Sequence, residues 1–185
     1  MVQVFFDGGA SRILGYGVLE SFDALKKKVD EWGMEQNSVF IDCAYRKDEV
    51  LSFCAKYQQI ALNGISAEEF PYTDPKTGKK VSRLFSQVKK HQTSYGIALQ
   101  INYSSKRMKD LFCILRDGHG VPYELPRDAS EKFRKSLFSE VKVAKHDGFD
   151  YKMVSPFNHY YDCCCMLLVG GQKWFKFPTI EVGGD

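Results

Sequence analysis

The segment that most limits the folds open to this chain is the run of residues 38–42 (SVFID). It is continuously apolar from Val39 to Ile41 and ends in an acid, Asp42. Runs of this kind are typical of strands that are buried on both faces, and such strands occur in parallel or mixed sheets covered by helices. The run therefore favours an α/β protein over an all-helical one.

The neighbouring segments fit this class. Apolar spacing, caps and turn residues predict strands, helices and a last apolar helix that begins near Asn158 and ends at Gly170-Gly171. Residues 65–96 show no period. We expect one domain over residues 1–171 and a tail over residues 172–185. The strands are predicted at residues 2–6, 11–20, 38–42, 59–62, 97–103 and 138–145, and the earlier helices at residues 22–32, 48–57 and 106–116.

Several classes of protein are excluded or made improbable. The longest apolar run, residues 163–169, is too short for a membrane helix, which needs about 20 residues, and no secretory signal precedes the first strand. There is no C-x-x-C pair, so a structural zinc site is not expected and reduced thiols fit best. The sequence also lacks the phosphate-binding loop of ATPases and the nucleophile elbow of hydrolases.

Charge is distributed unevenly along the chain. Residues 1–75 carry 7 basic and 12 acidic side chains, whereas residues 76–116 carry 10 basic side chains and one acid. A basic segment attracts phosphate backbones, although a solvated lysine-rich loop has the same composition. The candidate DNA-binding residues in this segment are Lys76, Lys79, Lys80, Arg83, Lys89 and Lys90.

Two acids stand out by their positions. Asp42 ends a buried strand, where ligands of open α/β sheets collect, and Asp162 lies one turn into the last apolar helix. A carboxylate in apolar surroundings needs a partner or a metal. Each acid also has a simpler explanation, as a cap after the strand for Asp42 and as a favourable charge near a helix N-terminus for Asp162. Together they point to a Mg²⁺ or Mn²⁺ site.

Several motifs, in order and spacing, resemble the nuclease domain of phage terminase large subunits, the DNA-packaging motor proteins, and in particular their lambda-like branch. The similarity extends over residues 2–170. The matching stretches are residues 11–17 (SRILGYG), 40–50 (FIDCAYRKDEV), 60–64 (IALNG), 109–111 (KDL), 139–142 (SEVK) and 158–163 (NHYYDC).

The resemblance implies an RNase H-like mixed sheet flanked by helices. It also implies a two-metal-ion DNA endonuclease that cuts concatemeric viral DNA, with Asp42 as the fourth-strand acid and Asp162 as the helix acid, both catalytic and metal-binding. The metals would be Mg²⁺ or Mn²⁺. The expected partners are double-stranded DNA, the terminase ATPase domain, the small subunit and the portal, and the expected location is the host cytoplasm, transiently on the procapsid.

The chain departs from the family pattern in two places. Asn63-Gly64 stands where the family usually has Lys-Gly, and the acid of the first strand is not found. Residues 2–6 match the second strand, so Asp7 lies in the turn after it and the sheet would lack its first strand. On this match, the chain is a fragment of a longer protein or a prophage remnant. Alternatively, residues 2–7 serve as the first strand, with Asp7 as its acid. We favour a truncated chain over the use of residues 2–7 as the first strand.

Two alternatives to a terminase nuclease stay open. One is a catalytically incomplete terminase fragment that acts only as a DNA-binding or motor-interaction module. It would bind DNA in a salt-dependent manner without cutting it. The other is an RNase H-like nuclease of the resolvase or integrase type, which would prefer branched or terminal DNA.

Overall fold

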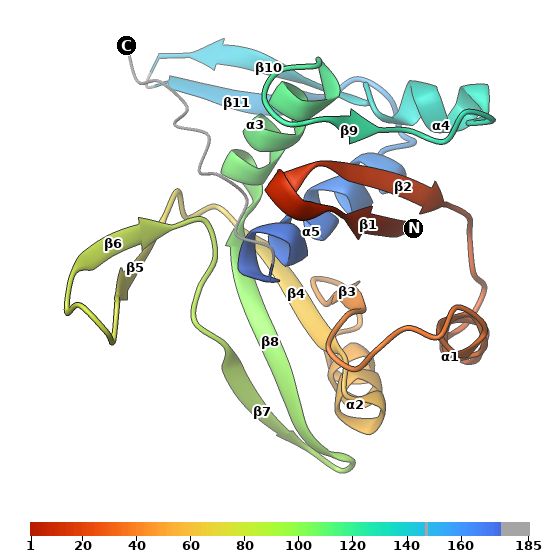
Figure 1. The fold of residues 1–185 in the computed structure, drawn as a ribbon, viewed down its shortest axis with the longest axis vertical. Coiled ribbons are helices and arrows are strands. Elements are labelled where there is room, and N and C mark those ends of the chain that lie inside the picture. Colours follow the sequence, from red (N-terminus) through yellow and green to blue (C-terminus); the bar gives the residue numbers. More distant parts are fainter. Residues whose placement is uncertain (147, 175–185) are drawn as a thin grey trace. The chain divides into compact units, whose positions relative to one another are not determined.

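A computed structural model describes residues 1–146 and 148–174 of the chain (Figure 1). The chain forms two compact units. Unit 1 comprises Met1–Gly17 and Lys106–Asp185, and unit 2 comprises Val18–Ser105. Residues 175–185, most of the tail expected after residue 171, lie outside the described residues.

Unit 2 contains a four-stranded sheet in the order β3-β4-β8-β7. The pairs β3/β4 and β4/β8 are parallel, and β7/β8 is antiparallel. A separate two-stranded antiparallel ribbon, β5–β6, belongs to the same unit. The strands are β3 (Phe40–Asp42), β4 (Ile60–Ile65), β5 (Phe70–Thr73), β6 (Lys80–Arg83), β7 (Lys89–Thr93) and β8 (Gly96–Ser104).

Two helices complete unit 2, α1 (Phe22–Glu31) and α2 (Lys47–Tyr57). α1 begins at Ser21, whose side chain accepts a hydrogen bond from the Ala24 amide as an N-cap. α2 packs against β4 and β8. The core between them is made of small and medium apolar side chains, which bring helix and sheet close together: Cys43, Val50, Leu51, Cys54, Ala61 and Ala98.

The described residues of unit 1 contain two small sheets. β1 pairs with β2 in antiparallel fashion, and β2 pairs with β9 in parallel, while β10 and β11 form an antiparallel hairpin. A short 3₁₀ turn, Asp7–Gly9, joins β1 to β2. The strands are β1 (Val2–Phe5), β2 (Ser11–Gly15), β9 (Tyr123–Glu124), β10 (Glu140–Lys145) and β11 (Gly148–Met153).

The helices of unit 1 are α3 (Ser105–Arg116), α4 (Glu131–Ser136) and α5 (His159–Trp174). Their buried aromatic side chains form much of the core. The ring of Phe112 meets that of Tyr161 edge-on at 5.0 Å, and Tyr16 stacks on Phe133 at 4.0 Å. Phe112, Tyr161 and Phe133 are fully buried. Edge-on and stacked pairs of this kind add to the free energy of burial.

The α/β class expected from the sequence is confirmed, with several small sheets packed against helices. Three local expectations are wrong. The strand predicted at residues 11–20 ends at Gly15, as β2. The strand at residues 38–42 is only half-buried, because β3 is the outermost strand of its sheet; the neighbouring strand β4 is buried over residues 60–62. The last helix continues through Gly170 and Gly171, which are buried, because a glycine weakens a helix by only about 1 kcal/mol and packing outweighs that.

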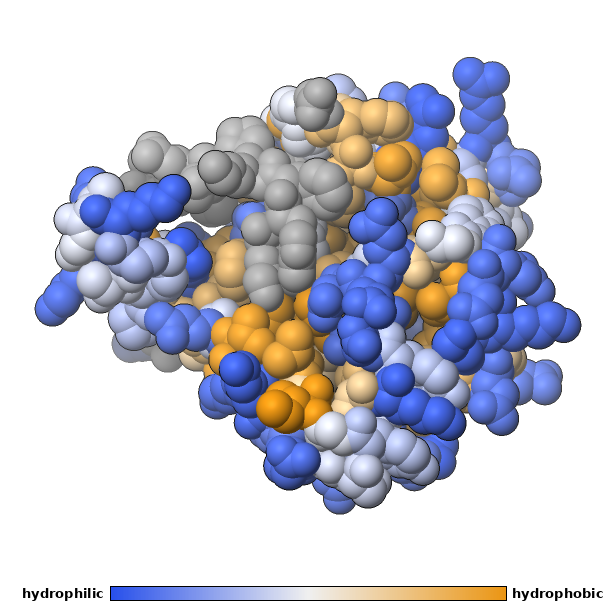
Figure 2. All heavy atoms as spheres, turned by 60° about the horizontal axis from the view of Figure 1, so that its bottom comes forward, coloured by the Kyte–Doolittle hydropathy of each residue, from blue (hydrophilic) through white to orange (hydrophobic). Residues whose placement is uncertain are grey.

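Hydrophilic side chains cover much of the face shown in Figure 2, with hydrophobic ones in smaller areas between them. Among the described residues, no helix has the length and apolar character needed to cross a bilayer.

Candidate functional site

Asp42 lies at the carboxyl end of β3, as the sequence predicts, and its side chain is exposed. Its Oδ1 accepts a hydrogen bond from the Ala44 amide at 3.0 Å, which holds the carboxylate against the turn that follows. The next residue, Cys43, is buried, and its amide donates to the Leu62 carbonyl. The local geometry therefore contains the cap predicted as the simpler explanation, and it also presents a carboxylate at the edge where ligands of parallel sheets bind.

Polar side chains lie beside this edge on β4 and β8. Asn63 and Asn102 are register partners, and Gln100 donates a hydrogen bond to Asn102 Oδ1 at 2.7 Å. Gly64 packs tightly here, because a Cβ at this position would approach the Tyr103 ring to 3.0 Å. Asn63 therefore contributes a neutral amide where the resemblance leads one to expect a lysine.

Asp162 lies in the first turn of α5, as predicted, and is half-buried. Its Oδ2 accepts a hydrogen bond from Asn158 Nδ2 at 2.9 Å, and the same Nδ2 lies 3.4 Å from Glu140 Oε1. Glu140 Oε2 in turn accepts from Lys109 Nζ at 2.5 Å. These four residues form a continuous polar chain, which we call the Asp162 network.

The Asp162 network is largely withdrawn from solvent. The Glu140 side chain is 5% exposed and the Lys109 side chain 17%. A buried carboxylate is tolerated when it is paired and hydrogen-bonded, and both Glu140 oxygens are engaged. Glu140 is therefore a structural support for Asn158 and, through it, for Asp162.

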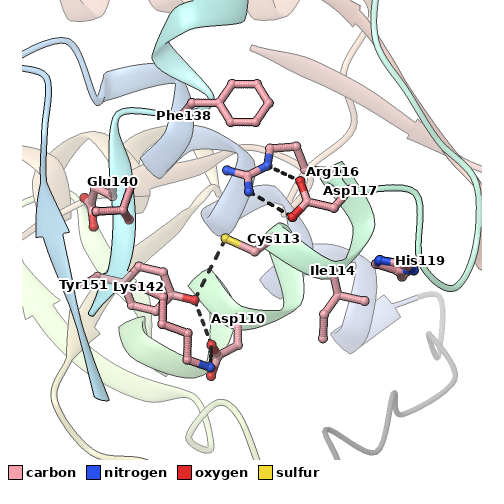
Figure 3. A pocket seen from close by; sticks show the side chains of 11 residues that line it. Asp110, Cys113, Ile114, Arg116, Asp117, His119, Phe138, Glu140, Lys142 and Tyr151 are labelled. Atoms are coloured by element: carbon pink, nitrogen blue, oxygen red, sulfur yellow. Dashed lines mark hydrogen bonds and ion pairs between the residues drawn. The ribbon is translucent and has the colours of Figure 1, made fainter. Parts of the chain in front are cut away.

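A second buried carboxylate lies one residue from Lys109. The Asp110 side chain is 3% exposed, and its Oδ1 accepts from Lys142 Nζ at 2.9 Å and from Tyr151 Oη at 2.7 Å (Figure 3). Burial, together with the hydrogen bond to Asp110, raises the pKa of Tyr151 well above its usual range, so the phenol stays protonated as a donor.

Sequence reasoning selected Asp162 and placed Asn158 as the N-cap of the last helix, but it assigned no individual role to Lys109, Asp110 or Glu140. A signal was present for Asp110, because it lies among the apolar residues that α3 buries, Met108, Leu111, Phe112 and Leu115. The contact between Glu140 and Asn158 was not predicted, because Glu140 lies on β10 and Asn158 lies just before α5.

The six predicted DNA-binding residues belong to unit 2. Lys76 and Lys79 lie in the turn of the β5–β6 ribbon, Lys80 and Arg83 in β6, and Lys89 and Lys90 in β7. The lysines are exposed, while Arg83 is half-buried with its guanidinium 3.1 Å from the centroid of the Tyr72 ring. The segment at residues 65–96, which shows no period in the sequence, thus contains the short strands β5, β6 and β7, and the predicted basic side chains lie on β6, on β7 and in the β5–β6 turn.

The two predicted metal ligands belong to different units, Asp42 to unit 2 and Asp162 to unit 1. Their carboxylate oxygens are the donors that Mg²⁺ and Mn²⁺ prefer. The described residues contain no group of three or more His, Cys, Asp or Glu side chains placed to hold a metal ion. Asp42 and Asp162 therefore offer donor atoms that suit these ions, but the described residues do not form a complete set of metal ligands. Asp7, the alternative first acid, lies in the turn after β1.

Comparisons of the chain with protein-family models, curated proteins and solved structures find no match. A function for the chain is therefore inferred from the motifs of the sequence and from the contacts that the structure makes between them.

Proposed function

We propose that this chain carries the nuclease of a DNA-packaging terminase large subunit, an RNase H-like endonuclease that cuts concatemeric viral DNA. The Asp162 network carries the proposal. Three motifs that are far apart in the sequence, at residues 109–111, 139–142 and 158–163, contribute Lys109, Glu140 and the pair Asn158 and Asp162 to one hydrogen-bonded chain.

The strand pairing also supports an RNase H-like fold. β3, which matches the fourth strand of that fold by the resemblance, pairs with β4 in parallel and lies in a mixed sheet. β1 and β3, which match its second and fourth strands, are each the outermost strand of their own sheet. That is the expected arrangement when the first strand, which lies between them in the family, is not part of these sheets.

In this proposal Asp42 and Asp162 are the metal ligands. Bound Mg²⁺ or Mn²⁺ would supply a hydroxide for attack on the phosphodiester and stabilise the leaving oxygen. Asn158 orients the Asp162 carboxylate by donating to its Oδ2, and the Lys109–Glu140 pair fixes Asn158. The basic residues of the β5–β6 ribbon and β7 hold the DNA backbone without reading its sequence.

The partners follow from the same proposal. Double-stranded DNA is the substrate, and the ATPase domain, the small subunit and the portal of a terminase would bring the nuclease to it. The chain would act in the host cytoplasm, on the procapsid, during packaging.

A plasmid-cleavage assay with Mn²⁺ and with Mg²⁺ tests the proposal. We expect the wild-type chain to nick supercoiled plasmid, and Asp42→Asn or Asp162→Asn to lower the rate at least a hundredfold without changing the circular dichroism spectrum. Asp48→Asn is the matched control, because Asp48 is an exposed acid nearby in α2. Cleavage retained by both Asp42→Asn and Asp162→Asn would refute the assignment of the site.

One observation favours a second function. Because the described residues lack a group of three metal ligands, the chain alone fits a terminase fragment that binds DNA, or other motor parts, without cutting. A folded wild-type chain that binds duplex DNA in a salt-dependent manner, and leaves the plasmid intact with either metal, would select this function over the first.

A further inference from the structure

We propose that an exposed apolar patch at the base of the β10–β11 hairpin, in unit 1, binds a segment of a partner protein in which acidic and large apolar residues are interspersed. The members of this hairpin-base patch are each 42–57% exposed: Phe138, Val141, Met153, Val154 and Phe157. The patch contains none of the proposed metal ligands or DNA-binding residues, so its role is independent of the proposed nuclease activity.

Backbone pairing brings the members of the patch to one end of the hairpin. The Ser139 carbonyl accepts hydrogen bonds from the amides of Val154 and Ser155, at 2.8 and 3.2 Å. These bonds continue the pairing of β10 with β11, which ends at the partners Glu140 and Met153. The apolar residues at the start of β10 therefore lie beside those at the end of β11.

A cation lies over each exposed aromatic ring of the patch. The central guanidinium carbon of Arg116 is 4.3 Å from the centroid of the Phe138 ring, and Lys132 Nζ is 5.2 Å from that of Phe157. Such contacts hold the two rings at the surface. Aromatic residues, methionine and arginine are enriched in protein interfaces, and clustered exposed apolar side chains mark interaction surfaces.

The cavity of about 450 Å³ between α3 and the hairpin offers a seat for an apolar anchor beside the patch. Its apolar lining includes Ile114, Phe138 and Val141. The acids of the lining are each paired with a cation: Asp117 with Arg116 (Figure 3), Asp110 with Lys142 and Glu140 with Lys109. The cavity therefore suits an uncharged side chain of the partner, such as phenylalanine or leucine, rather than an ion.

The surroundings of the patch are basic. Residues 130–142 and 151–157 carry five basic side chains and two acidic ones, and one of these acids, Glu140, is buried and paired with Lys109. Lys132 and Lys152 are exposed and form no ion pair with another described residue. Charge complementarity therefore calls for acidic residues around the apolar anchors of the partner.

The same charges argue against two other occupants. In a two-fold interface between copies of this chain the patch would face itself, so its basic surroundings would repel each other. Duplex DNA would satisfy the lysines, but its contacts are mostly with phosphate and sugar, so it would leave the apolar side chains against a charged backbone. A segment with both acids and apolar anchors matches the whole patch.

Selection from a random peptide library against the immobilised full chain tests the inference. We expect the enriched peptides to combine a net negative charge with large apolar residues. In fluorescence anisotropy with a synthetic copy of the most enriched peptide, Phe138→Ser and Phe157→Ser should each weaken binding about tenfold. Phe6→Ser is the matched control, because Phe6 is also exposed with a cation, Arg12, over its ring; it should change the affinity by less than about twofold.

A pair of charge reversals tests the basic surroundings separately. Lys132→Glu combined with Lys152→Glu should weaken binding of the same peptide about tenfold. Lys27→Glu combined with Lys28→Glu, at exposed positions of α1, changes the net charge equally and should alter the affinity by less than about twofold.

Enrichment of no peptide, enrichment of neutral or basic peptides, or binding that is unchanged in all the patch variants would each overturn the inference. Phe138→Ser and Phe157→Ser that weaken duplex DNA binding but not peptide binding would assign the patch to nucleic acid instead. A wild-type dimer that these two variants dissociate would assign it to a second copy. Both results would also overturn the inference.

Discussion

At the scale of single residues, the Lys109–Glu140 pair is expected to matter most for stability. Removing one partner of a buried pair leaves an uncompensated charge, so Lys109→Met should lower the free energy of unfolding by about 3–5 kcal/mol. Urea denaturation measures this. Lys135→Met is the control, because the Lys135–Glu131 pair is exposed and should contribute less than about 1 kcal/mol. Equal losses in the two variants would contradict the buried network.

The thiols give a prediction about pH. Burial raises the pKa of Cys54 and of Cys164 to about 12. Because only the thiolate is nucleophilic, neither thiol should gain reactivity between pH 7 and pH 9, the range in which a free cysteine ionises. Mass spectrometry after alkylation at pH 8 should find both unmodified in the folded protein and modified in urea. Modification of either at the rate of a free thiol in folded protein would contradict their burial.

Residue positions near the site could be predicted only in part. Asp42 after a strand and Asp162 in the first turn of the last helix follow from local pattern, and the structure places both there. The contacts of Asp162 could not be predicted, because Lys109 reaches Glu140 across 31 positions of sequence and Asn158 reaches Glu140 across 18. No local periodicity in the sequence predicts contacts between side chains that are so far apart along the chain.

At the scale of secondary-structure elements, the close approach of β4 to its neighbour β8 predicts how one added methyl group at Gly64 changes the stability. Gly64→Ala places a Cβ 3.0 Å from the Tyr103 ring, and Tyr103 is buried and cannot move aside freely. We expect a loss of about 1–3 kcal/mol in the free energy of unfolding, from overpacking. Gly17→Ala is the control, since no atom lies within 4 Å of the added Cβ there. If Gly64→Ala left the free energy of unfolding unchanged, this would contradict the close approach of Gly64 to the Tyr103 ring.

Elements with a strong local period could be predicted well. The helices expected at residues 22–32, 48–57 and 106–116 correspond to α1, α2 and α3 within one residue at each end. β5, β6 and β7 were missed. β6 and β7 are exposed and basic, with no regular alternation of apolar and polar side chains. β5 alternates in burial but is only four residues long and contains Pro71, which marks a turn in the sequence. β11 was also missed, since its pairing with β10 provides a stability that its own sequence does not reveal.

At the scale of the whole molecule, the uneven charge predicts how DNA binding depends on salt. Changing Lys76, Lys79 and Lys80 to Gln should reduce the slope of log affinity against log salt by roughly 2–3, since each phosphate that a lysine neutralises adds about 0.9 to that slope. Fluorescence anisotropy with a short duplex measures the slope. The control changes Lys26, Lys27 and Lys28 of α1 to Gln, which removes the same charge and should leave the slope nearly unchanged. Equal reductions of the slope in the two triple variants would indicate that net charge alone attracts the DNA.

The central claim is that Asp42 and Asp162 are metal ligands, and Mn²⁺ binding followed by electron paramagnetic resonance tests it without depending on catalysis. The wild-type chain, titrated with Mn²⁺ beside a duplex, should remove the signal of the free ion. Asp42→Asn and Asp162→Asn should each weaken this binding at least tenfold, while Asp48→Asn should not. Binding that is absent from the folded wild-type chain, or that is unchanged in both ligand variants, would contradict the claim.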